Sequence, residues 1–191
     1  MLFYFIRKNI VTVKSVHFYF RRQGMFEKGS LMVYDTAGVC RVEDIGVPEG
    51  LPVARKGREY YKLTPVFGSG TIYIPVDTKV FMRPVISRQE AERLIRRIPE
   101  IRENLCESGN QKVLENHYKE FLLTHDCEDL VQLIKTVYMK NKNLERIGKK
   151  AGKTDMQYMK RAMALLHEEL SIALEIPVDE VEDYIANAVE R

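Results

Sequence analysis

Short apolar runs separated by glycines fill the chain from Met25 to about Pro84. The runs between the seven glycines of this region are rich in Val, Ile, Tyr and Thr, residue types that favour strands. Strands are predicted at 31–34, 39–45, 59–64 and 71–75. Phe67-Gly68-Ser69-Gly70 predicts a hairpin turn between the last two strands.

Helical periodicity replaces this pattern at Val85. Ser87-Arg88-Gln89-Glu90 is a capping box, and the helix that it begins is ended or restarted by Pro99. Further helices are predicted at 111–123, from Asp126 to about Gly148, from a second capping box at Thr154 through Leu170, and from Asp179 onward.

The two patterns predict an α+β protein of two domains. The first is a small N-terminal Tudor/SH3-like antiparallel β barrel at residues 25–84, because short strands joined by tight turns are typical of such barrels. The second is an all-α helical domain at residues 85–191. A barrel of this kind offers strand edges to partners.

Residues 1–24 differ from the rest, since six of them are Phe or Tyr and none is acidic. A secretion signal is disfavoured because Arg7 and Lys8 follow the apolar stretch instead of preceding it, and no small-residue cleavage site comes before Met25. We expect a poorly ordered extension, or a segment upstream of the true start with Met25 as the functional start.

Composition narrows the class of protein. The chain of 191 residues is 45% hydrophobic and 30% charged, enough to bury a core, and it has no apolar run approaching ~18 residues, so no membrane partner is expected. Its three cysteines, Cys40, Cys106 and Cys127, are odd in number and widely spaced, which favours neither disulfides nor a zinc knuckle. A reducing cytoplasm fits best.

Charge is distributed unevenly along the chain. The formal net charge is +3, but residues 1–24 carry five basic and no acidic residues, so the remainder is at −2. Residues 135–161 hold nine basic groups against Glu145 and Asp155, whereas residues 168–190 hold eight acidic groups and no basic one. This basic junction, with Lys149, Lys150 and Lys153 at its centre, could neutralise DNA phosphates or be an ordinary solvated surface.

Signatures of catalysis are missing from the sequence, which has no G-x-S-x-G elbow, H-E-x-x-H or phosphate loop. We therefore expect no enzyme activity and no cofactor. A metal-dependent enzyme using His117, His125, Asp126 and Cys127 is a weaker alternative, because two histidines eight residues apart do not share the i, i+4 geometry of a helical metal site.

Four stretches follow one another along about 165 residues from Met25 on: MFEKGSLMVYDTAGVCRVEDI, TIYIPVDTKVFMRPVIS, YKEFLLTHDCEDLVQLIKTVYMKNK and KTDMQYMKRAMALLHEEL. In this order they resemble the CarD (CdnL-like) family of bacterial transcription regulators, whose N-terminal module is shared with the transcription-repair coupling factor.

The resemblance implies a Tudor-like domain that binds the β subunit of RNA polymerase and a helical domain that contacts promoter DNA at the upstream edge of the bubble, modulating open-complex stability. By position, the polymerase-facing strand would include Tyr73, Ile74 and Pro75. The DNA face would include Asn116, His117 and Lys119. The free protein is expected to be a monomer.

Two positions depart from the family pattern. Many members have a tryptophan that wedges at the junction of duplex and melted DNA, whereas this chain has no Trp and Leu114 occupies that place. Leu114 could still act as a wedge, or it could belong to the core. Tyr73 stands where relatives often have Arg. A protein-interaction module that binds polymerase without direct DNA contact is therefore the alternative function.

Overall fold

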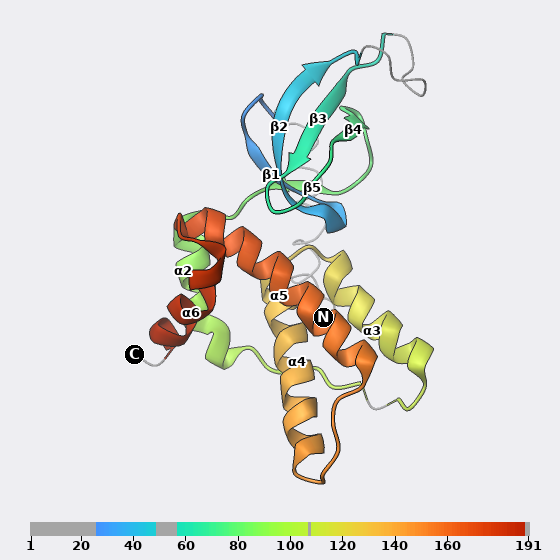
Figure 1. Cartoon of the computed structure of the whole chain (residues 1–191), viewed down its shortest axis with the longest axis vertical. Coiled ribbons are helices and arrows are strands. Elements are labelled where there is room, and N and C mark those ends of the chain that lie inside the picture. Colours follow the sequence, from blue (N-terminus) through green and yellow to red (C-terminus); the bar gives the residue numbers. More distant parts are fainter. Residues whose placement is uncertain (1–25, 49–56, 107, 190–191) are drawn as a thin grey trace, which may run out of the picture.

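A computed structural model describes residues 26–48, 57–106 and 108–189 of the chain (Figure 1). The expected N-terminal extension at residues 1–24 lies outside the described residues. Strands occupy the described chain up to Pro84, and helices follow from Arg88. The protein is thus α+β, with an N-terminal β part and a helical part.

The β part is one antiparallel sheet of five strands in the order β4-β3-β2-β1-β5. Its strands are β1 (Leu31–Tyr34), β2 (Gly38–Gly46), β3 (Tyr60–Pro65), β4 (Ile72–Pro75) and β5 (Met82–Pro84). The four predicted strands are confirmed to within one residue at each end. The prediction missed β5, because three residues that include a proline show no alternation. Closure of the sheet into a Tudor/SH3-like barrel stays a prediction.

The sheet buries one small hydrophobic core. Its fully buried members alternate along the central strands, as a half-buried sheet requires: Met32, Cys40, Val42, Tyr61, Leu63 and Ile74. A register shift between Val42 and Asp44 marks a bulge where β2 pairs with β3, and such bulges bend a strand.

The helical part contains α2 (Arg88–Arg97), α3 (Gln111–Leu123), α4 (Cys127–Glu145), α5 (Lys153–Leu174) and α6 (Val181–Val189). Short 3-10 turns lie at Ile98–Glu100 (η2) and Val178–Glu180 (η3). The Ser87 capping box is confirmed, since its hydroxyl accepts from the Glu90 N–H and the Glu90 carboxylate accepts from the Ser87 N–H.

The capping box predicted at Thr154 is wrong. The helix α5 begins at Lys153, and the Asp155 carboxylate accepts a hydrogen bond from the Gly152 N–H at 3.0 Å. The acidic residue that caps the helix is therefore three residues after Gly152, which shifts the start of the helix.

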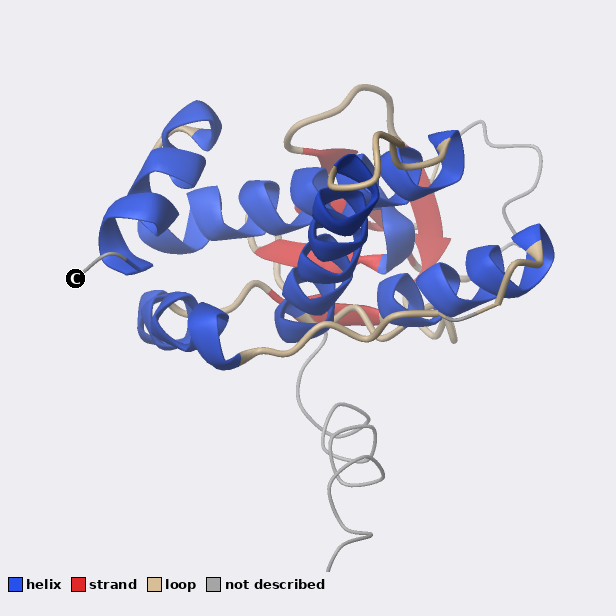
Figure 2. Cartoon of the chain, turned by 90° about the horizontal axis from the view of Figure 1, so that it is seen from below, coloured by secondary structure: helices blue, strands red, loops and turns tan. Residues whose placement is uncertain are grey.

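Helix α5 is the centre of the helical part. It packs against α4 and α3, while α2 and α6 cover its C-terminal end (Figure 1). It also contacts β2, so the same helix joins both parts of the molecule, and Figure 2 shows the helices lying across the sheet. In the described part of the chain, no helix is both long enough and apolar enough to cross a membrane.

Candidate functional site

The strand β4 forms one edge of the sheet. It pairs with β3, and it is the last strand in the sheet order. Tyr73 is 40% exposed and stands opposite Lys62 on the outer face, whereas Ile74 is buried in the sheet core and Pro75 is half-buried. Of the three residues predicted to face polymerase, Tyr73 therefore offers a side chain, and Ile74 supports the strand from inside.

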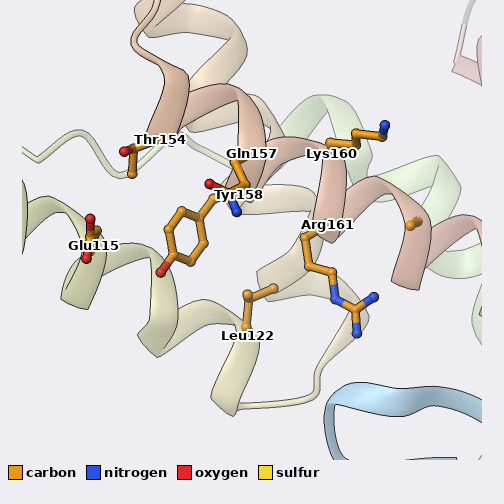
Figure 3. Close-up of a pocket in the computed structure, with 8 residues that line it drawn as sticks. Glu115, Leu122, Thr154, Gln157, Tyr158, Lys160 and Arg161 are labelled. Carbon is orange, nitrogen blue, oxygen red and sulfur yellow. The ribbon is translucent and has the colours of Figure 1, made fainter.

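A groove of about 640 Å³ runs between α3 and α5 (Figure 3). Its α3 wall is made by Glu115 and Leu122. Its α5 wall is made by Thr154, Gln157, Tyr158, Lys160, Arg161 and Ala164. The groove is thus lined by one aromatic ring, two cations and several hydrogen-bonding groups, a mixture that suits a polar, anionic ligand.

Positive charge gathers around this groove. Lys119 lies on the α3 stripe of Glu115 and Leu122, because residues three or four apart share a helix face. Lys153 lies one turn before Gln157 on α5, and both lysines are exposed. Arg161 donates to the Thr36 carbonyl oxygen of the 3-10 turn η1 (Asp35–Ala37), which ties one end of the groove to the β part.

The predicted DNA-facing residues of α3 do not share one face. Asn116 is exposed, on the side that also carries Lys119. His117 is half-buried and points elsewhere: its Nε2 lies 2.8 Å from the Asn104 carbonyl oxygen, and its ring meets Phe121 edge-on at 5.1 Å. By helical spacing, Lys119 and Lys153 flank the groove without belonging to its lining, and His117 lies outside it.

Leu114 lies in the helical core. It is only 8% exposed and belongs to the buried cluster that also contains Tyr118 and Phe121. Of the two alternatives for this residue, its burial favours a core position over a wedge at the surface.

The basic loop before α5 is held by a buried polar cluster. Asp155 is buried, and its Oδ1 accepts from the Tyr118 hydroxyl and from Lys140 Nζ, both at 2.7 Å. Burial raises the pKa of Asp155, but these hydrogen bonds and the one from Gly152 outweigh it, so the pKa lies below its usual value. The ionised carboxylate fastens α3 and α4 to the first turn of α5, next to exposed Lys149, Lys150 and Lys153.

A second buried cluster joins the sheet to the helices. Arg83 of β5 pairs with Glu169 of α5, with Nη2 and Oε2 2.7 Å apart, and the same nitrogen donates to the His125 carbonyl oxygen at 2.7 Å. Glu169 also accepts from the Ile86 N–H at 3.1 Å and from the Cys127 thiol at 3.1 Å. The two parts of the molecule thus share a hydrogen-bonded joint, which we call the Arg83–Glu169 joint.

His125 adds an aromatic contact to this joint. Its ring stacks on Phe81 with centroids 4.3 Å apart, and its Nε2 lies 3.6 Å from Asp35 Oδ1. Burial lowers the pKa of His125 and outweighs the opposing effect of Asp35, while Arg83 lowers the pKa further. The imidazole is therefore neutral at neutral pH, and its 3.6 Å approach to Asp35 is not an ion pair there.

The four residues of the alternative metal site make separate contacts instead of gathering around one point. His117 and His125 make the contacts given above, Asp126 caps α4 through the Glu128 N–H at 2.8 Å, and Cys127 is buried against Glu169. Among the described residues, no three His, Cys, Asp or Glu side chains gather in a way that could hold a metal ion.

Sequence reasoning did not single out Gln157, Tyr158, Lys160 or Arg161 as site residues. Lys160 and Arg161 belong to the basic stretch that the sequence shows, and Tyr158 precedes them by one turn or less. The sequence signal that could have identified these site residues is an aromatic residue, Tyr158, within one helical turn of two basic residues. Their convergence with α3 could be found only from the packing of the two helices.

Comparison with known proteins gives a family for the β part. Residues 26–86 match the CarD-like/TRCF RID domain, which covers all five strands and the connection to α2. A comparison with curated protein sequences found no match. The match confirms the resemblance seen in the sequence over this region: residues 26–86 are similar to the CarD-like/TRCF RID domain.

Proposed function

We propose that this protein is a non-enzymatic transcription regulator that binds RNA polymerase through its β part and contacts promoter DNA through its helical part. The match of residues 26–86 to the RID domain, a polymerase-interacting domain, carries the first half. The partner would be the β subunit, and the exposed edge at β4 would receive it by strand pairing. Such a regulator, a monomer when free, would act in the cytoplasm of a bacterium.

Capture of RNA polymerase by the full chain tests the proposal that the β part binds polymerase. We expect Tyr73→Asp to weaken capture at least tenfold, because it places a carboxylate on the β4 edge without removing a core side chain. Tyr138→Asp is the matched control, since Tyr138 is an exposed tyrosine on α4, and it should leave capture unchanged. Absence of capture by the unaltered chain at low salt would overturn the polymerase half.

The DNA half rests on the cations around the α3/α5 groove. Contacts to phosphates supply affinity that falls with salt, with a slope of roughly −0.9 per phosphate neutralised on duplex DNA. Contact near the upstream edge of the bubble would then change the stability of open complexes. Lys119→Gln and Lys153→Gln should each weaken promoter protection and lower the salt slope by about one.

The second candidate is a polymerase-binding module without direct DNA contact. The burial of Leu114 favours it, because the residue aligned with the family wedge is unavailable at the surface. The two candidates differ in footprinting: upstream protection and promoter opening that both survive Lys119→Gln together with Lys153→Gln would support the second.

A further inference from the structure

We propose that the α3/α5 groove binds a short stretch of unpaired DNA, with the Tyr158 ring as the stacking surface for one base. This inference rests on the proposed function, because it specifies which form of promoter DNA the helical part prefers. It assigns the contact with melted DNA to α5 and not to position 114 of α3.

Tyr158 has the properties of a prepared stacking surface. Its ring lines the groove and is half-exposed (Figure 3). Behind it lies the Tyr118 ring, with centroids 5.5 Å apart, and Tyr118 is itself buried and fixed by its hydrogen bond to Asp155. A ring held in place from behind loses little conformational entropy when a base stacks on it.

The α5 wall is suited to a nucleic-acid backbone. Lys153, Gln157 and Lys160 follow one another at helical spacing, and seven residues of helix span about 10 Å. Phosphates repeat every ~3.4 Å along the axis of one duplex strand, so this length corresponds to about three nucleotides of duplex and to fewer of a more extended unpaired strand. Cations beside an aromatic ring are the combination that binds single strands without reading sequence.

One carboxylate, that of Glu115, also lines the groove, and it already accepts a hydrogen bond. Glu115 Oε1 accepts from Gln111 Nε2 at 3.3 Å, and the same amide donates to the Thr154 hydroxyl. Glu115 is thus held at the end of the groove near Thr154, whereas Arg161 lies seven residues, about two turns of α5, further toward the β part (Figure 3).

An acidic peptide helix is the competing occupant, and the lining fits it less well. A helix bound in a groove needs apolar anchors at several successive turns. Leu122 and Ala164 are the aliphatic side chains among the lining residues, and both lie toward the same end as Arg161. The remaining lining is polar or aromatic, as a base and its phosphate require.

The test compares three DNA probes at one low salt concentration with the full chain. Fluorescence anisotropy would give Kd for a duplex, for the same duplex with an unpaired extension (forked DNA), and for a single strand. We expect the unaltered chain to prefer forked DNA to duplex. Tyr158→Leu should weaken forked-DNA binding by about 5- to 100-fold, the equivalent of losing one stacked base. Its effect on duplex binding should stay below about twofold.

Two variants control for folding and position. Tyr158→Phe keeps the ring and the contact with Tyr118, so it should bind forked DNA as the unaltered chain does. Tyr138→Leu removes an exposed tyrosine of α4 that lies outside the groove lining and should change nothing. Circular dichroism would verify that Tyr158→Leu is folded, and a Tyr158→Phe protein that loses forked-DNA binding would contradict the stacking role.

The other possible outcomes of these binding measurements distinguish failure of this inference from failure of the proposed function. If Tyr158→Leu weakens duplex and forked DNA equally, or neither, the inference is wrong while the DNA half of the proposed function survives. If it weakens polymerase capture and leaves DNA binding intact, the groove is a protein site. If the unaltered chain binds none of the probes, the DNA half and this inference both fail, and polymerase capture is unaffected.

Discussion

At the residue scale, Glu169 and Arg83 illustrate a buried charge pair that joins two parts of a fold. The Glu169 side chain is 3% exposed and that of Arg83 is 17% exposed, so neither charge is well solvated. A buried ion pair adds little net stability, because desolvation offsets the attraction, yet removing one partner is costly. The pair therefore matters more for the position of the β part relative to the helical part than for the net free energy of folding.

We predict that Arg83→Met lowers the free energy of unfolding by about 3–5 kcal/mol, since Glu169 is left buried without its cation. The double variant Arg83→Met/Glu169→Met should recover much of this loss, although the His125 carbonyl and the Ile86 N–H then lack a partner. Urea unfolding followed by circular dichroism measures both. Additive losses in the double variant would show that the two charges do not interact.

Leu114 gives a prediction that separates a core residue from a wedge. Because its side chain packs with Tyr118 and Phe121, Leu114→Ala should destabilise the protein by about 2–5 kcal/mol. At temperatures where the variant is folded, DNA binding should be unchanged. Unchanged stability with weakened binding of forked DNA would instead favour the wedge.

At the element scale, the turn between α3 and α4 carries a pH-sensitive contact of the joint. It places His125 at φ 56°, with its ring stacked on Phe81 and its Nε2 3.6 Å from Asp35 Oδ1. Because burial lowers the pKa of His125 in the folded state, the unfolded chain binds this proton more readily. The stability contributed by His125 is complete above about pH 6.5 and is lost as pH falls toward the lower folded-state pKa.

We therefore predict that stability declines from pH 7 to pH 5 by up to about 1.4 kcal/mol per pH unit for each such group. Burial lowers the pKa of His167 as well, which acts in the same direction, and raises the pKa of Glu168, which acts against it. His125→Asn should flatten the slope, since Asn tolerates positive φ and does not titrate. Urea unfolding at several pH values tests this, and an unchanged slope would exclude His125.

Local sequence patterns predict the elements well and their contacts poorly. The Ser87-to-Glu90 box and the 111–123 periodicity depend on residues close in sequence, and the structure has both. The start of α5 was misplaced because two pairs have the spacing of a capping box, Thr154 with Gln157 and Gly152 with Asp155, and the structure uses the second. The burial of Leu114 and the exposure of Tyr158 depend on how α3 packs on α5, which no local pattern contains.

At the scale of the whole molecule, the joint sets the β4 edge and the α3/α5 groove at fixed places on one body. Gly38, at the start of β2, lies against α5. A Cβ at this position would lie 2.7 Å from Glu168 Oε2 and 3.3 Å from Leu165 Cδ2, and the backbone is at φ +78°. The backbone at Gly38 therefore favours glycine, and a side chain there would displace the Glu168 carboxylate from its place against β2.

Gly38→Ala should separate polymerase binding from the effect on DNA. The added methyl displaces the Glu168 carboxylate and presses on Leu165 where β2 meets α5, while the β4 edge, on the far side of β3, stays intact. We expect polymerase capture within about twofold of the unaltered chain and a partial loss of upstream promoter protection, because the contact that holds α5 against β2 is loosened. Capture assays and footprinting on the same preparations give both values.

Gly29→Ala is the control that makes this prediction specific. Gly29 has a similar backbone, φ +88°, but a Cβ there would meet nothing within 4 Å, so the variant carries the backbone strain without the clash. If both variants lose promoter protection equally, the loss comes from strain in the β part. If only Gly38→Ala loses it, the contact between β2 and α5 transmits position from polymerase to DNA, and its geometry is part of the function.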